Sequence, residues 1–96
     1  MSTVAPPAPA VAVELFGVPR LLAGTRHLAV AGRTLGDVAA ALGETCPVLL
    51  GPVLDPATGW LREGYIFVAG ERFSRDPERQ VGDGSAVLLV SSVAGG

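Results

Sequence analysis

The order of apolar and polar residues predicts two strands in the first third of the chain. Residues 11–16 (VAVELF) alternate in size and polarity, which is typical of a half-buried strand. The Gly-Val-Pro sequence at residues 17–19 breaks this strand and is expected to open a loop. Residues 26–30 (RHLAV) predict a second strand, which we expect to pair with the first as a hairpin.

The next segment carries the clearest helical pattern of the chain. A helix is expected from Leu35 to about Glu44, because four apolar residues recur there at helical spacing on one face. Thr34 stands where an N-cap belongs, and Asp37 follows three residues later, as in a short form of the capping box. Pro47 ends the helix. The four apolar residues are Leu35, Val38, Ala39 and Leu42.

The last third of the chain predicts three more strands. Residues 65–68 are rich in β-formers, residues 69–70 offer a tight turn, and residues 72–73 would return as a short partner strand. A Gly-Asp-Gly turn precedes the final strand at residues 86–90. The order β-β-α-β-β-β predicts an α+β fold of the β-grasp type, in which a mixed sheet of about five strands packs on one main helix.

Two of these strands are continuously apolar. Residues 65–68 and 86–90 contain no polar residue, a pattern typical of strands that are buried on both faces. One helix can cover only one face of a sheet. Either residues 48–54 cover part of the other face, or an apolar face stays open for a partner.

Composition and charge narrow the class of protein. The chain has 96 residues, of which 49% are hydrophobic and 17% charged, with a net charge of −2. This length predicts one small domain, and the high apolar content excludes disorder throughout. The absence of a basic block speaks against nucleic-acid binding.

No stretch predicts a membrane span or a signal peptide, so we expect a cytoplasmic protein without a membrane partner. Residues 1–10 contain three prolines and predict a disordered lead-in, followed by the domain at 11–90 and a flexible tail at 91–96.

The inventory of reactive side chains is poor in catalytic groups. The chain has no lysine, one cysteine (Cys46) and one histidine (His27). A metal site normally needs three or four ligands of this kind, so none is expected. A nucleophile–base pair would have to combine Cys46 with His27, and the simpler interpretation is a buried thiol and an exposed imidazole. We therefore expect a protein that is not itself an enzyme.

The strongest functional signal lies at the end of the sequence. Residues 91–96 (SSVAGG) are uncharged, and six extended residues span up to about 20 Å. Glycine has no Cβ, so Gly95 and Gly96 can enter a tunnel that is too narrow for other residues. A terminal carboxylate is ionised at pH 7 and is a poor acyl electrophile until it is activated, for example as an adenylate. The tail is thus expected to be a substrate for another protein's active site.

These segments together resemble one known family. The chain is similar over residues 11–96 to the ubiquitin-like sulfur carrier proteins, such as the small subunit of molybdopterin synthase and the thiamine-biosynthesis carrier. Ala69 stands where asparagine is common in this family, which leaves the type of that turn open. The similar segments are VELFG at 13–17, TLGDVAAAL at 34–42, IFVAGERF at 66–73, VGDGSAVLLV at 81–90 and VAGG at 93–96.

The resemblance implies a role in sulfur transfer. An E1-like adenylyltransferase would use ATP to adenylate the Gly96 carboxylate, and a persulfide donor of the rhodanese type would convert it to a thiocarboxylate. A sulfur-accepting synthase would then use this sulfur to make molybdopterin, cysteine, thiamine or a specialised metabolite. The chain itself would bind no cofactor. Val93, Ala94 and Gly95 would thread the partner's active site, and Phe67 and Leu88 would either dock a partner on the open sheet face or pack in the core.

The sequence is compatible with two other functions. The chain could be a ubiquitin-like modifier that is joined through Gly96 to lysines of target proteins, because the same tail and the same adenylation serve both roles. It could also be an interaction module in which the two glycines have no special role.

Overall fold

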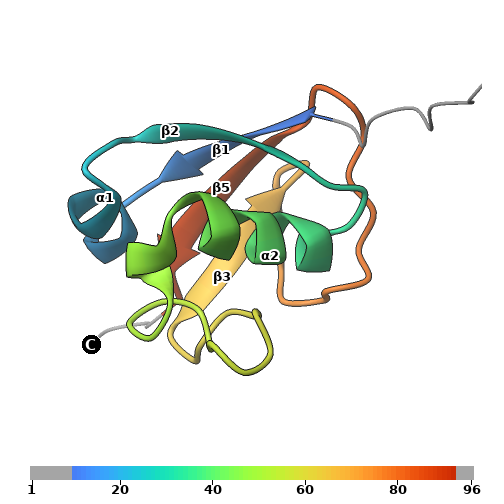
Figure 1. The fold of residues 1–96 in the computed structure, drawn as a ribbon. Coiled ribbons are helices and arrows are strands. Elements are labelled where there is room, and N and C mark those ends of the chain that lie inside the picture. The colour runs from blue at the N-terminus through green and yellow to red at the C-terminus, as the bar shows by residue number, and fades with distance from the viewer. Residues whose placement is uncertain (1–9, 93–96) are drawn as a thin grey trace, which may run out of the picture.

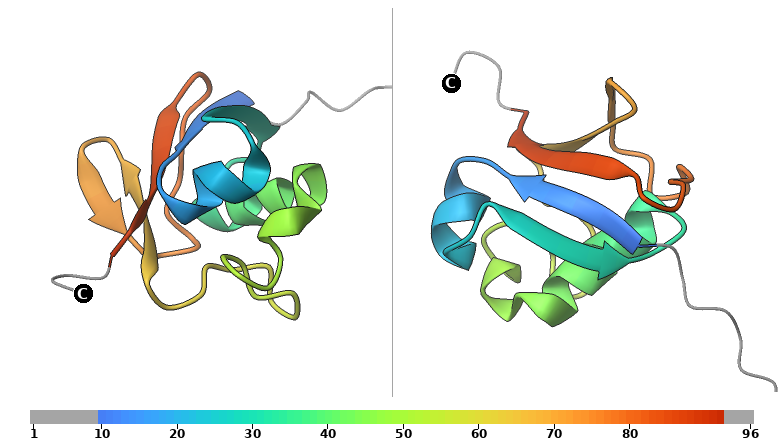
Figure 2. Two further views of the ribbon diagram at one scale, coloured as in Figure 1. Left: turned by 90° about the vertical axis from the view of Figure 1, so that its left-hand side faces the viewer. Right: turned by 90° about the horizontal axis from the view of Figure 1, so that it is seen from above.

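Five strands form one mixed sheet, and the helices lie against one of its faces (Figures 1 and 2). The computed structural model describes residues 10–92. The predicted α+β architecture of the β-grasp type, with five strands and one main helix, is confirmed. The elements in chain order are β1 (Ala10–Leu15), α1 (Val18–Ala23), β2 (His27–Ala31), α2 (Leu35–Thr45), the 3-10 helix η1 (Pro47–Leu49), β3 (Tyr65–Ala69), β4 (Arg72–Ser74) and β5 (Ala86–Ser91).

The last strand lies in the middle of the sheet. The strand order is β2-β1-β5-β3-β4. β1 and β2 pair antiparallel as the expected hairpin, whereas β1 and β5 pair parallel, with Leu15 opposite Leu89. Because β1 and β5 run in the same direction, their carboxyl ends meet at one edge of the sheet, where α1 begins and β5 ends (Figure 2, right).

The core fills the space between the sheet and α2. β1 contributes alternate residues to it, and α2 contributes the apolar face predicted from its spacing. η1 and the loop after it add Leu49, Val53 and Leu54 on the same side of the sheet. Residues 48–54 therefore extend the core that α2 covers, and they do not cover the opposite face.

The opposite face of the sheet is partly open. Residues 65–69 of β3 and 86–90 of β5 are apolar, but only Phe67, Ala69, Val87 and Leu89 are buried, and the residues between them are half-buried. Burial on both faces, the usual meaning of such runs, is therefore wrong for these strands. All helices of the described residues lie on the other side of the sheet, so no element between residues 10 and 92 covers the second face (Figure 2, left). Of the two alternatives, the open apolar face is the one observed.

A short helix occupies residues that the sequence pattern predicted as loop. Gly17 turns the chain with a φ of 63°, α1 follows, and Gly24 ends it in a left-handed conformation at φ 71°. Pro19 lies in the first turn of this helix, where a missing N–H costs no hydrogen bond. The proline therefore lies in the first turn of a helix here, and the loop that the sequence pattern predicts is wrong.

The hairpin between β3 and β4 turns one residue later than expected. Ala69 is still part of β3 and pairs with Arg72, so the two turn residues are Gly70 and Glu71. Both have positive φ, at 58° and 65°. Positive φ at both positions is typical of the type I′ turn of two-residue hairpins. The alanine at position 69 thus has no influence on the turn itself.

The capping box at the start of α2 is confirmed. The Thr34 hydroxyl accepts a hydrogen bond from the Asp37 backbone N–H at 3.1 Å, and the Asp37 carboxylate accepts one from the Thr34 N–H at 3.3 Å. This carboxylate also accepts from the Arg33 N–H at 3.0 Å. Three backbone donors of the helix start are thereby satisfied.

Loss of this cap is expected to lower stability measurably. Replacing Thr34 with alanine removes the oxygen that accepts from Asp37, which typically lowers the free energy of unfolding by about 1 kcal/mol. Urea unfolding followed by circular dichroism measures the difference. The control is Thr34→Ser, which keeps the hydroxyl. An equal loss of stability in both variants would show that the methyl group of Thr34, and not its hydroxyl, stabilises the helix.

The described residues contain no helix that is long and apolar enough to cross a membrane.

Candidate functional site

The chain is held in the sheet up to the last residue that the structure describes. The Phe16 N–H donates to the Leu89 carbonyl at 3.2 Å, and Ser91 lies opposite Tyr65 in the β3–β5 ladder. One residue further, the Ser92 N–H donates to the Gly64 carbonyl at 2.7 Å. β5 therefore ends at Ser91, one residue beyond the predicted end of the last strand, and the hydrogen bond of Ser92 defines the point from which the tail leaves.

The four predicted tail residues Val93, Ala94, Gly95 and Gly96 lie outside the described residues, and their roles remain predictions. Because Ser92 is still hydrogen bonded, the chain available to reach a partner is shorter than the sequence indicated. Four extended residues span at most about 14 Å. A partner that takes the carboxylate of Gly96 into its active site must therefore come close to the edge of the sheet around Ser92.

An arginine organises the loop beside this exit. The Arg75 guanidinium donates to the carbonyls of Tyr65, Arg62 and Leu61, the latter two at 3.2 Å. Leu61 and Arg62 precede β3, and Tyr65 is its first residue. Gly64, which accepts the hydrogen bond from Ser92, lies between Arg62 and Tyr65 in the chain. Arg75 thus fixes the backbone that anchors the exit.

The surface hollow near this loop has mixed charge. Its volume is about 460 Å³, and it carries two carboxylates and two guanidinium groups, so it favours neither an anion nor a cation. It is lined by Asp55, Leu61, Arg62, Glu63 and Arg75.

The two predicted docking residues lie on opposite faces of the sheet. Phe67 is fully buried on the helix side, where its ring lies 5.9 Å from that of Trp60 at an angle of 59°. Phe67 therefore packs in the core, and its predicted contact with a partner is wrong. Leu89, which pairs with Phe67, is buried on the same face, and its strand neighbour Leu88 points to the opposite face. Leu88 lies half-buried on the open face and pairs across the ladder with Val68. Its docking role remains a prediction.

Cys46 and His27 are not brought together. Cys46 follows α2 on the helix side of the sheet and is half-buried. His27 is exposed in β2, and its neighbour Leu28 pairs with the buried Val13, so His27 points to the other face. Between residues 10 and 92, no group of three or more His, Cys, Asp or Glu residues is placed to hold a metal ion.

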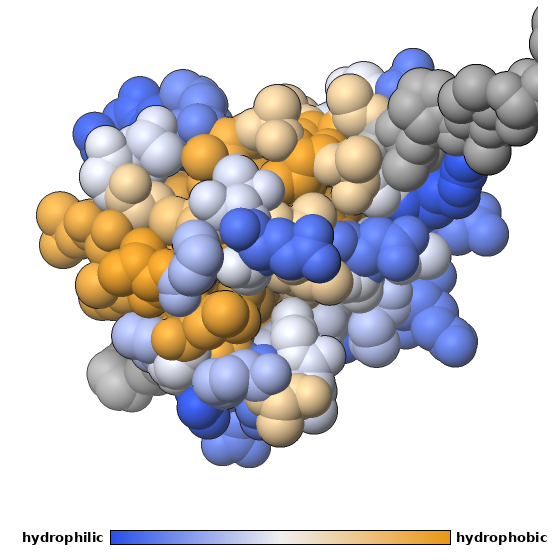
Figure 3. Space-filling model, viewed as in Figure 1, coloured by the Kyte–Doolittle hydropathy of each residue, from blue (hydrophilic) through white to orange (hydrophobic). Residues whose placement is uncertain are grey.

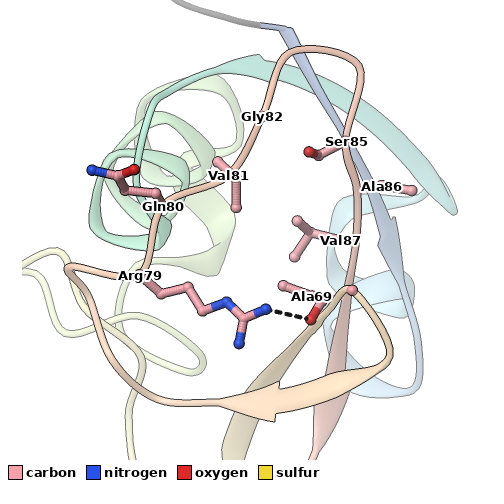
Figure 4. A pocket seen from close by; sticks show the side chains of 9 residues that line it. Ala69, Arg79, Gln80, Val81, Gly82, Ser85, Ala86 and Val87 are labelled. Carbon is pink, nitrogen blue, oxygen red and sulfur yellow. Dashed lines mark hydrogen bonds between the residues drawn. The ribbon is translucent and has the colours of Figure 1, made fainter.

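A cavity of about 240 Å³ lies at the far end of β5 (Figure 4). Arg79 supplies its charged side chain, but the guanidinium already donates to the Ala69 carbonyl at 3.1 Å. The remaining lining is formed mainly by glycine, alanine and valine residues together with Gln80 and Ser85. The cavity lies near Ala86, at the start of the strand, whereas the tail leaves at the other end, so the two are separate features.

Sequence patterns did not indicate Gly64 and Arg75 as parts of the exit. Gly64 accepts from a residue 28 positions later in the chain, a contact that exists only once β3 and β5 are paired. Arg75 lies in a charged segment that looks like an ordinary solvated loop. No local signal distinguishes an arginine that binds carbonyls from one that faces water.

Known proteins provide a comparison at the level of structure. No family model and no curated protein matches the sequence. The structure is similar to small archaeal modifier protein 1 (SAMP1) from Methanosarcina acetivorans, with 23% identity, a TM-score of 0.78, and coverage of 92% of this chain and 97% of that one. It is similar to a putative molybdopterin converting factor subunit 1 from Pyrococcus furiosus, with 19% identity, a TM-score of 0.69, and coverage of 90% and 100%.

A third similar structure comes from the BexX/CysO complex of Amycolatopsis orientalis, with 18% identity, a TM-score of 0.72, and coverage of 90% of this chain and 99% of that one. In all three comparisons the matched region covers at least 90% of both chains. The resemblance inferred from the sequence is thereby confirmed at the level of the fold. The chain has the β-grasp fold of the ubiquitin-like proteins.

Proposed function

We propose that this chain is a sulfur carrier protein, a co-substrate of other enzymes, whose reacting group is the carboxylate of Gly96. The observation that carries the proposal is the exit at Ser92. A hydrogen-bonded strand end is followed by Val93, Ala94 and two glycines, and this combination presents a carboxylate at a limited reach from a folded domain.

The chemistry requires two partner activities. An E1-like enzyme transfers the AMP part of ATP to the Gly96 carboxylate, which releases pyrophosphate and leaves an acyl-adenylate. The terminal sulfur of a persulfide donor attacks the acyl carbon and AMP leaves. A thiol then cleaves the resulting acyl disulfide, so the tail ends in a thiocarboxylate. A synthase accepts this sulfur into its product.

The open face of the sheet is the proposed docking surface for the accepting synthase. Its apolar residues run across three neighbouring strands, and Phe73 at the sheet edge is 69% exposed. Apolar surface of this kind, left uncovered by the chain's own helices, is typical of interaction sites. The proposed contact residues are Leu88, Val68, Ile66, Val90 and Phe73.

A second candidate function is protein modification. The similarity to small archaeal modifier protein 1 favours it, because that protein has the same fold and nearly the same length. In this role the adenylated Gly96 would be joined to a lysine of a target protein. The chain has no lysine of its own, so it could not form chains on itself.

The mass of the C-terminal tryptic peptide tests the proposal. The chain is incubated with a cognate E1-like enzyme, ATP and a persulfide source, and then cleaved after Arg79. The peptide from Gln80 to Gly96 contains neither cysteine nor methionine, so a mass gain cannot come from oxidation of sulfur side chains. We expect replacement of one oxygen by sulfur, located on Gly96 by fragmentation.

Two results would contradict this expectation. An unchanged peptide, with an enzyme that charges another carrier under the same conditions, would argue against sulfur transfer to this chain. Covalent attachment of the peptide to lysines of other proteins, without a thiocarboxylate, would favour the modifier function. A reaction without ATP serves as the control for chemical exchange.

A further inference from the structure

A second apolar surface lies on the helix side of the molecule, away from the open sheet face. The described residues have five large hydrophobic side chains that are exposed, and four of them belong to α1, η1 and the residue after η1. Leu21 is 80% exposed, and Val18 and Val48 are each 48% exposed. Figure 3 shows apolar residues gathered over α1 and the end of α2. We call Val18, Leu21, Val48 and Leu50 the α1/η1 patch.

The exposed part of this patch does not contribute to the core. Pro19 is the buried residue of α1 and Leu22 is half-buried against the core, so these two anchor the helix. α1 packs against η1, which brings Val18 and Leu21 to the same region as Val48. Since the fold leaves Leu21 almost fully in water, its apolar character has no structural purpose in the isolated domain, and clustered apolar side chains of this kind mark interaction sites.

The patch flanks the point where the tail leaves the domain. β1 and β5 are parallel, with Leu15 opposite Leu89, and the Phe16 N–H is bonded to the Leu89 carbonyl. α1 begins two residues after Phe16, and β5 ends two residues after Leu89, followed by Ser92. The start of α1 and the end of β5 therefore lie at the same edge of the sheet, as Figure 2 shows in its right-hand view.

The geometry points to the enzyme that adenylates Gly96 as the partner of this patch; we propose that its surface around the carboxylate site docks on the α1/η1 patch. This inference rests on the proposed function. The tail beyond Ser92 reaches at most about 14 Å, so an enzyme that holds the carboxylate must bring its surface against this edge of the domain. The accepting synthase, which also takes the tail, is proposed for the open sheet face, so the activating enzyme is the occupant of this second patch.

The size of the patch fits such a partner better than a second copy of this chain. Stable dimers bury about 800 Å² on each partner, which four partly exposed side chains cannot supply. An enzyme that already holds the tail needs only a small second contact, because that contact forms at a high effective concentration. A small apolar patch next to a short tether meets this requirement.

Steady-state kinetics of adenylation test the inference. Pyrophosphate release is measured with the full chain, ATP and the cognate activating enzyme over a range of carrier concentrations. Leu21→Asp is expected to raise the KM for the carrier about tenfold with little change in kcat, because it removes a binding contact and not a reacting group. Leu21→Met keeps an apolar side chain of similar size and is expected to retain the wild-type KM.

A matched charge at the other end of the sheet controls for electrostatic effects. Ala31 is exposed and pairs with Ala10 at the edge opposite α1, so Ala31→Asp adds the same charge away from the patch. We expect a wild-type KM for this variant. A melting temperature close to wild type for Leu21→Asp, expected from its 80% exposure, separates docking from unfolding.

The outcomes separate this inference from the proposed function. If wild-type chain is adenylated but Leu21→Asp has the same KM, or if Ala31→Asp raises the KM as much, the docking surface is elsewhere and the sulfur carrier proposal stands. If the wild-type chain is never adenylated, the proposed function fails and this inference fails with it.

Discussion

One alanine added after Gly96 is expected to abolish adenylation of the chain while its stability stays unchanged. The extension moves the carboxylate by about 3.5 Å along the tail and places a methyl group where the last glycine stood. The attacking carboxylate must lie within near-contact distance of the α-phosphate of ATP, and a misplacement of even 1 Å can reduce a rate about a hundredfold. Leu89, the last buried residue of the part of the chain that the structure describes, lies seven positions before Gly96, so we expect the stability of the fold to stay unchanged.

ATP–pyrophosphate exchange measures this effect, with the melting temperature as the control for folding. An alanine inserted between Ser2 and Thr3 gives a chain of the same mass and composition and should react like the wild type. Gly95→Val is expected to block the reaction as well, because its branched side chain does not enter a tunnel shaped for glycine. Wild-type exchange in the extended chain would show that Gly96 is not the reacting residue.

Replacing Phe67 with alanine is expected to have the largest effect on stability. The ring is fully buried between the sheet and the helices and contacts Trp60. Removal of a buried phenylalanine side chain typically costs about 3–5 kcal/mol, and domains of this size have about 5–15 kcal/mol in total. Between about a fifth and the whole of the free energy of unfolding would therefore be lost.

Chemical unfolding followed by fluorescence tests this result, since Trp60 is the single tryptophan and lies next to the substituted ring. Phe67→Leu keeps much of the volume and should lose far less stability. The matched variant on the open face is Leu88→Ala, for which a loss of about 1 kcal/mol is expected because the side chain is half-buried. Equal losses at positions 67 and 88 would contradict the difference in burial between the two faces.

The sequence predicted most of the elements because their signals are local. The helical spacing and the Thr34–Asp37 cap lie within a few residues of each other, and the structure has both. The strands at the two ends of the chain and the hairpin partners were also predicted within one or two residues. Such signals need no information about distant parts of the chain.

α1 was missed because its signals have two meanings. The Gly-Val-Pro sequence at residues 17–19 fits the end of a strand, but its proline also fits the first turn of a helix. Six residues are too few for a helical pattern to be recognised, and isolated helices of this length are not stable in water. Packing of Pro19 and Leu22 against the core stabilises this helix, and that packing depends on the rest of the fold.

Phe67 in β3 and Leu88 in the adjacent strand β5 also show that local sequence does not predict burial. Both lie in uniformly apolar strands, and such strands carry no alternation that would tell the inner face from the outer one. The register of β3 against β5 places Phe67 opposite Leu89 and Leu88 opposite Val68, and this pairing decides which side chain is buried.

The sequence alone determined the class of fold, the capped helix and a tail of small residues, because spacing, turn residues and residue size are properties of short segments. Only the tertiary structure decided which apolar residues are buried, where the tail leaves the sheet and which surface flanks that point. The parallel pairing of β1 with β5 brings the start of α1 and Ser92 to one edge, although they are more than 70 residues apart in the chain. Contacts over such separations follow from the packing of the whole domain and leave no trace in any local pattern.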